Sequence, residues 1–136
     1  MPEGRRSAGE AASNGTQLRR CRSDPGLDLV HLSRQCQGDR ELEAELLRLF
    51  RLQLRALSTQ LSDLSAPESK ARTAHKLRGS ALAVGAGRVA RAAKAIEEKA
   101  LAARGDARHL EAVSKAVGVL EAAAAEVVVE IELICG

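Results

Sequence analysis

The chain has 136 residues, of which 45% are hydrophobic and 29% charged, proportions ordinary for a single globular domain. Phe50 is its one aromatic residue, whereas alanine accounts for 25 residues. Because strands favour β-branched and aromatic residues and helices favour alanine, this composition predicts an all-α fold. The scarcity of rings also argues against a site for single-stranded nucleic acid, whose bases stack on them.

The positive charge of the chain lies near its N-terminus. Residues 1–23 contain five Arg and two Glu, whereas residues 24–136 contain 16 basic and 16 acidic side chains. A basic stretch without hydrophobic periodicity predicts a flexible tail over residues 1–24, followed by a domain over 25–136. Since that domain is neutral, we expect no nucleic acid as a partner.

Neither a signal peptide nor a membrane span is evident in the sequence, so we expect a cytoplasmic protein without a membrane partner. The three cysteines, Cys21, Cys36 and Cys135, are odd in number and lack the spacing of a zinc site. We therefore expect reduced thiols and no metal.

Helix signals divide the domain into one short helix and four longer ones. Asp28 is placed to cap the short helix, and Asp39 to cap the next. Ser65-Ala66-Pro67-Glu68 has the pattern of a capping box with Pro in the first turn. Glycines at 85, 87 and 105 separate the last three helices, and Asp106 caps the final one.

The expected buried faces follow from apolar residues spaced three or four apart. Short connections between such helices predict an antiparallel, up-down-up-down four-helix bundle with a short N-terminal lead helix. The last helix keeps its apolar heptads for more than three repeats, a pattern that serves equally for a dimer. Inside a bundle the same stripe is core, so we expect a monomer. The predicted inner positions are Leu42, Leu46, Phe50, Leu54, Leu57, Leu61 and Leu64; Ala71, Ala74, Leu77, Ala81 and Val84; Val89, Ala93, Ile96, Ala100 and Ala103; and Leu110, Val113, Val117, Leu120, Ala124, Val127, Ile131 and Ile134.

The segment around His75 carries the most chemically informative residues. At 100° per residue, His75 falls outside the apolar stripe of its helix, so its imidazole is expected at the surface. Gly79, one turn further on, leaves open space beside the ring, and Arg78 is a neighbour on the same surface. Residues 70–94 contain seven cations and no acid. An accessible nitrogen nucleophile in a positive field suits a phosphoryl group.

Helix pairing around Ala86 brings a carboxylate to this histidine. His75 lies 11 residues before Ala86 and Glu97 lies 11 residues after it, so the two side chains are expected to be level. A carboxylate there accepts the Nδ1 proton and leaves Nε2 unprotonated and nucleophilic. Lys94, one turn from Glu97, is placed to contact a phosphoryl oxygen.

Each of these features also has an ordinary structural explanation. A lone helical histidine is usually a surface residue, a glycine within a helix usually serves close packing, and a run of cations is usually a solvated face. We interpret His31 and His109 in that way, because neither has metal-ligand spacing to His75.

The heptapeptide HKLRGSA at residues 75–81, followed by the Gly-Ala pair at 85–86, resembles the signature of histidine-phosphotransfer (HPt) domains of bacterial two-component phosphorelays. The resemblance extends over residues 27–134. It implies a four-helix bundle that carries a phosphoryl group on histidine between receiver domains. The expected function is therefore phosphotransfer within a phosphorelay.

The resemblance also implies roles for individual residues. His75 is the phosphoacceptor at Nε2, and Gly79 keeps access to it open. Glu97 matches the residue that bonds the imidazole. Arg78 replaces the usual lysine that contacts the phosphoryl group, so a planar guanidinium takes the place of a compact ammonium group.

The implied partners are response-regulator receiver domains and a hybrid histidine kinase. The receiver supplies Mg²⁺, so this chain is expected to need no cofactor. Since it has neither a Gly-rich nucleotide loop nor an acidic metal cluster, we expect a carrier without ATP-dependent kinase activity. The alternative is a helical adaptor that binds receiver or kinase domains without being phosphorylated. We expect the docking surface to include Arg72, Lys76, Ser80 and the exposed Leu82.

Overall fold

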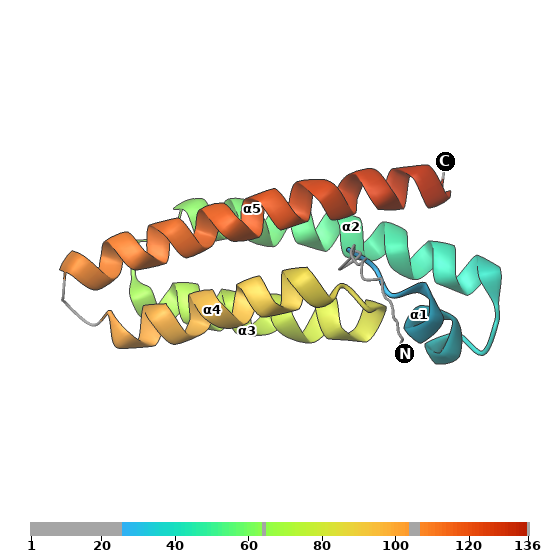
Figure 1. Ribbon diagram of the computed structural model, residues 1–136, viewed down its shortest axis with the longest axis horizontal. Coiled ribbons are helices and arrows are strands. Elements are labelled where there is room, and N and C mark those ends of the chain that lie inside the picture. The colour runs from blue at the N-terminus through green and yellow to red at the C-terminus, as the bar shows by residue number, and fades with distance from the viewer. Residues whose placement is uncertain (1–25, 64, 104–106, 136) are drawn as a thin grey trace, which may run out of the picture.

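The computed structural model describes residues 26–63, 65–103 and 107–135, and within these ranges every regular element is a helix. The short α1 (Leu29–Gln35) precedes four longer helices, which are α2 (Arg40–Asp63), α3 (Pro67–Val84), α4 (Gly87–Ala102) and α5 (Ala107–Cys135). Figure 1 shows the four longer helices side by side along the long axis, with α1 at one end. The all-α prediction is thus confirmed.

Contacts between neighbouring helices close the bundle into a ring. The most extensive contact is between α3 and α4, followed by that between α4 and α5, and α2 packs on both α5 and α3. Helix α1 touches α2 and α3. A single apolar core runs between the helices, and no polar or charged residue of the described chain is buried in it.

Of the four expected N-caps, those at Asp28 and Asp39 are present, and Asp106 lies outside the described residues. The Asp28 carboxylate accepts a hydrogen bond from the backbone N–H of His31 (3.0 Å), and that of Asp39 from the N–H of Leu42 (3.1 Å). The prediction of a capping box at Ser65 is wrong, because Ala66 is the N-cap of α3 and makes no side-chain hydrogen bond. A residue before proline is held in an extended conformation, so Pro67 fixes the first helical position one residue later than the box requires.

The predicted inner stripes of α3 and α4 are confirmed at every position, but those of α2 and α5 fail near the helix ends. Leu42, Leu110 and Ile134 are 43%, 43% and 47% exposed, and Leu46 is half-buried against the core beside the fully buried Leu47. An α-helix drifts about 20° per heptad from a strict seven-residue repeat, so a stripe extrapolated along a long helix leaves the core. Leu64, Gly105, Asp106 and the predicted tail lie outside the described residues.

Candidate functional site

His75 projects from the outer surface of α3. The inner face of that helix consists of fully buried residues, among them Ala74 just before His75 and Leu77 just after it. The imidazole therefore points away from the core, and 62% of its side-chain surface is exposed. A ring placed in this way is accessible to a partner molecule.

Glu97 on α4 holds one nitrogen of this ring. The His75 Nδ1–H donates a hydrogen bond to Glu97 Oε2 over 3.0 Å. In a neutral imidazole, donation from Nδ1 leaves Nε2 as the unprotonated nitrogen. The contact is the one expected from the equal distances of the two residues from the turn.

The tight turn between α3 and α4 sets this register. Gly85 ends α3 in the left-handed conformation (φ 84°), and α4 begins two residues later at Gly87. Glycine adopts such a positive φ without steric cost. Buried alanines along both helices keep the pair close, so that short side chains meet across the seam.

Arg78 joins the same cluster from α3. Its guanidinium Nη1 lies 3.8 Å from Glu97 Oε1, so the two oxygens of one carboxylate face the imidazole and the guanidinium. The sequence assigned Arg78 to the phosphoryl group and did not foresee its pairing with Glu97. The signal was available, because residues three apart on a helix share an edge.

The remaining predicted residues surround this cluster without joining it. A Cβ added at Gly79 would meet no atom within 4 Å, so the surface beside the ring is open. Arg72 donates to Ser69 Oγ (3.3 Å), and Ser80 is half-buried. Lys76 on α3 and Lys94 on α4 both have exposed side chains.

A surface hollow opens beside His75 toward the N-terminal end of α3. It has Glu97 and Arg72 on its walls, together with two residues that the sequence reasoning missed, Glu68 and Leu101. Leu101 is one turn beyond Glu97 and is 47% exposed. That helical spacing was the signal that could have identified it.

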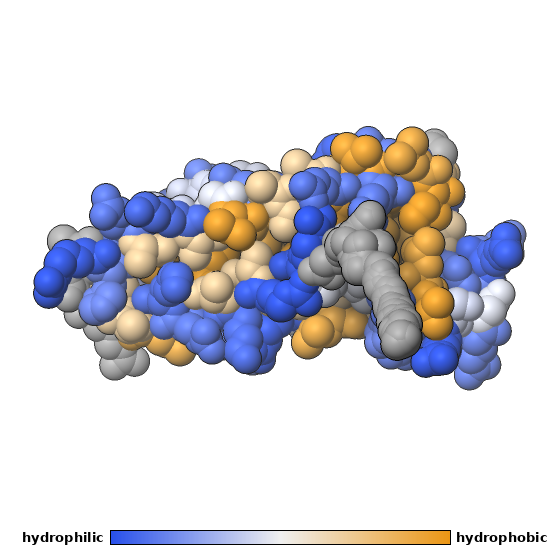
Figure 2. Space-filling model, viewed as in Figure 1, coloured by the Kyte–Doolittle hydropathy of each residue, from blue (hydrophilic) through white to orange (hydrophobic). Residues whose placement is uncertain are grey.

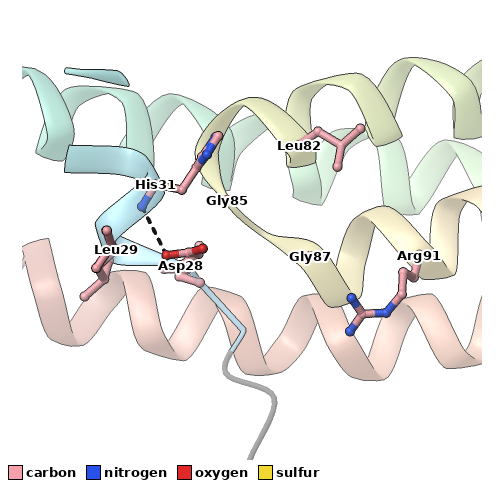
Figure 3. Close-up of a pocket in the computed structure, with 9 residues that line it drawn as sticks. Asp28, Leu29, His31, Leu82, Gly85, Gly87 and Arg91 are labelled. Atoms are coloured by element: carbon pink, nitrogen blue, oxygen red, sulfur yellow. Dashed lines mark hydrogen bonds between the residues drawn. The ribbon is translucent and has the colours of Figure 1, made fainter. Parts of the chain in front are cut away.

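A second hollow lies at the other end of α3, where α1 packs on the turn (Figure 3). The exposed Leu82 of α3 lines this hollow together with Leu29 and His31 of α1. A backbone hydrogen bond from Asp28 N–H to the Gly85 carbonyl (2.8 Å) ties the two segments together. The apolar surface expected around Leu82 thus includes α1, which the sequence reasoning had not placed there.

Within residues 26–63, 65–103 and 107–135, no three His, Cys, Asp or Glu side chains are grouped to hold a metal ion. Cys36 and Cys135 are free cysteines. Burial raises the pKa of the Cys36 thiol, and the carboxylates of Glu43 and Asp39 raise it further, so the protonated thiol is favoured.

None of the described helices has the length and apolar character needed to cross a membrane.

A family model described as the Hpt domain matches residues 44–128, which is more than half of the chain and includes both His75 and Glu97. No curated protein and no solved structure was found to match the chain. Proteins of the matched family take part in signal transduction through histidine phosphotransfer in phosphorelays. With the signature histidine on α3 and its carboxylate partner on α4, the chain belongs to the Hpt domain family.

Proposed function

We propose that this protein is a cytoplasmic phosphohistidine carrier that moves a phosphoryl group between aspartates of receiver domains in a two-component phosphorelay. In this proposal the helices form an up-down-up-down bundle with α1 as its lead helix. The observation that carries the proposal is the exposed His75 whose Nδ1 is bonded to Glu97. A surface histidine held in one orientation by a carboxylate is arranged for nucleophilic attack rather than for packing.

The transfer begins with neutral His75 facing an aspartyl phosphate of a docked receiver. The Nε2 lone pair forms the N–P bond as the P–O bond to the aspartate breaks, and the aspartate leaves as a carboxylate. The imidazole becomes positively charged while retaining its Nδ1 proton. Glu97, already 3.0 Å from that nitrogen, stabilises this charge. Transfer to the next receiver reverses these changes.

Basic side chains offset the charge of the transferred group. Arg78 lies three residues after the histidine on α3, and its guanidinium Nη1 lies 3.8 Å from Glu97 Oε1. When a phosphoryl group arrives, its oxygens compete with Glu97 for this guanidinium. Lys94 adds a second cation from α4. The receiver supplies Mg²⁺ in this proposal, and positioning with charge neutralisation accounts for this chain's share of the catalysis.

The receiver is proposed to dock over the outer face of α3. Gly79 leaves room for its active-site loop, and Arg72, Lys76 and Ser80 surround the approach. Leu82 is 55% exposed and borders the hollow against α1, so it offers an apolar contact beyond the open glycine.

Phosphotransfer from a panel of phosphorylated receiver domains tests the proposal. The protein should acquire acid-labile, base-stable label from at least one receiver, whereas His75→Gln should acquire none and keep its helical circular dichroism. Leu82→Asp should acquire label more slowly, with the same circular dichroism. If no receiver labels the folded protein, the adaptor function replaces the carrier function. We expect this chain to have no kinase activity of its own. Labelling of the purified protein by ATP, with no other protein present, would contradict that expectation.

A further inference from the structure

The carboxylate of Glu97 is engaged on both of its oxygens. Oε2 accepts the hydrogen bond from His75 Nδ1 over 3.0 Å, and Oε1 lies 3.8 Å from Nη1 of Arg78. The Glu97 side chain is 21% exposed, so solvent screens these interactions less than it would at an open surface site. The guanidinium is therefore placed to restrict rotation of the carboxylate, which is a different role from contact with a phosphoryl group.

Arg78 differs in its burial from other cations around the histidine. Its side chain is 31% exposed, whereas Arg72, Lys76 and Lys94 are exposed residues. Figure 2 faces α4 and shows hydrophilic side chains spread over the outer surface of this helix. A long side chain at an exposed position loses rotamer entropy when it is held in one geometry, so its ion pairs are weak. The half-buried Arg78 is therefore better placed than these three residues to hold the carboxylate.

The guanidinium of Arg78 is also chemically suited to orient a carboxylate. It presents several N–H groups in a planar, rigid arrangement, whereas the ammonium of a lysine is a compact charge on a flexible stem. Arg78 follows His75 by three residues on α3, so the two side chains are neighbours on that helix. Both reach the same carboxylate on α4, and each faces a different oxygen of it. An arginine that holds Oε1 thereby leaves Oε2 toward the imidazole.

The position of the proton on the His75 ring depends on this arrangement. In a neutral imidazole, the hydrogen bonds of the ring decide which nitrogen carries the proton. The His75 side chain is 62% exposed, so packing does little to hold it, and the acceptor at Nδ1 orients it instead. We propose that Arg78 is a positioning residue, which holds Oε1 of Glu97, keeps Oε2 at Nδ1, and so keeps Nε2 unprotonated before any phosphoryl group arrives.

This role of Arg78 belongs to the resting protein and precedes its contact with the transferred group. Its importance for transfer rests on the proposed function, whereas the tautomer is a property of the unphosphorylated chain. Once a phosphoryl group draws the guanidinium away, the His75 ring is positively charged, and this charge holds Glu97 at Nδ1. Orientation of the carboxylate by Arg78 is therefore needed while the ring is neutral.

Nitrogen NMR of the full, unphosphorylated chain at about pH 9, where an imidazole is neutral, tests the role of Arg78. The ratio of the Nε2–H form to the Nδ1–H form of His75 should rise about two- to fivefold in Arg78→Gln, since partly exposed ion pairs are modest. The spectrum of His75→Gln identifies the signals of this ring among the three histidines. The matched control is Arg72→Gln, which removes the same charge three residues before His75. Because Arg72 donates to Ser69, this control should leave the ratio unchanged.

The same substitution in a Glu97→Gln background shows whether Arg78 acts through the carboxylate. The ion pair is absent there, so Arg78→Gln should change the ratio no further, and an equal rise in both backgrounds overturns the proposal. So does an unchanged ratio in Arg78→Gln, or an equal rise in Arg72→Gln, in variants that circular dichroism shows to be folded. These spectra require no receiver. A tautomer shift in a protein that no receiver labels therefore contradicts the proposed function alone, and labelling without the shift contradicts the positioning role alone.

Discussion

Helices α3 and α4 form one pair in the bundle, and α2 and α5 form another, but the two pairs are built from different side chains. Most residues buried on α3 and α4 are alanines, whereas large aliphatic side chains and Phe50 dominate the buried faces of α2 and α5. Small side chains bring two helix axes close together, and large ones bury more apolar area. The first pair therefore sets the geometry of the site, and the second supplies most of the stability.

The largest expected effect separates stability from site geometry. Leu54 of α2 is 0% exposed, so Leu54→Ala should lower the free energy of unfolding by about 2–5 kcal/mol, because a cavity replaces the side chain. Denaturant titration measures this loss. Leu52→Ala, at a position 61% exposed, should change stability little. The phosphotransfer rate per folded molecule should be unaltered, and a large fall in that rate would show that α2 also shapes the site.

An intermediate effect is expected at the alanine seam. Ala93 of α4 is 0% exposed, so Ala93→Leu forces α4 outward and should cost about 1–3 kcal/mol of stability. The same movement lengthens the 3.0 Å contact between His75 and Glu97, so phosphotransfer should fall as well. Nitrogen NMR of the imidazole should show a mixture of tautomers.

The exposed Ala102 gives the matched control for that substitution. Ala102→Leu adds the same side chain on the same helix without crowding the seam, so it should leave both the tautomer and the transfer rate unchanged. If the two leucine variants behave alike, the close approach of α3 and α4 is not what positions the histidine.

The smallest effect concerns Gly79. An added Cβ meets no atom within 4 Å, so Gly79→Ala should stabilise the helix by up to about 1 kcal/mol. It should also slow transfer from a receiver, because it narrows the approach to the ring. Gly118→Ala, at an equally open position on α5, should give a similar gain in thermal stability with no change in transfer. Equal transfer rates in the two variants would show that Gly79 does not control access to the His75 ring.

The sequence predicted the α3–α4 pair better than the α2–α5 pair, and the reason is physical. Inner stripes of alanine are unambiguous on helices of 18 and 16 residues, and a turn of two residues leaves one choice of register. That register is enough by itself to put Glu97 beside His75. On α5, with 29 residues, periodicity found the core stripe but extended it to Leu110 and Ile134, which are exposed near the helix ends.

Other features of the site depend on contacts that no local pattern encodes. The bond between Asp28 and Gly85 joins residues far apart in the sequence, and it holds α1 beside Leu82. The pairing of Arg78 with Glu97 depends on how closely α3 and α4 approach. Sequence spacing identified the edge of the helix but not which oxygen of the carboxylate each cation faces.

The packing of α1 also decides where the smallest independently folding unit begins. The family match starts at residue 44, yet Leu27 and Leu32 are 4% and 1% exposed and belong to the common core. Burying a leucine contributes about 1.5–3 kcal/mol, so removing both would erase a large part of the stability of a small domain. A Cβ at Gly85 would approach the Asp28 carbonyl to 2.7 Å, so this position and the segment before α2 constrain each other. A truncation designed from the family boundary alone would therefore cut through the hydrophobic core.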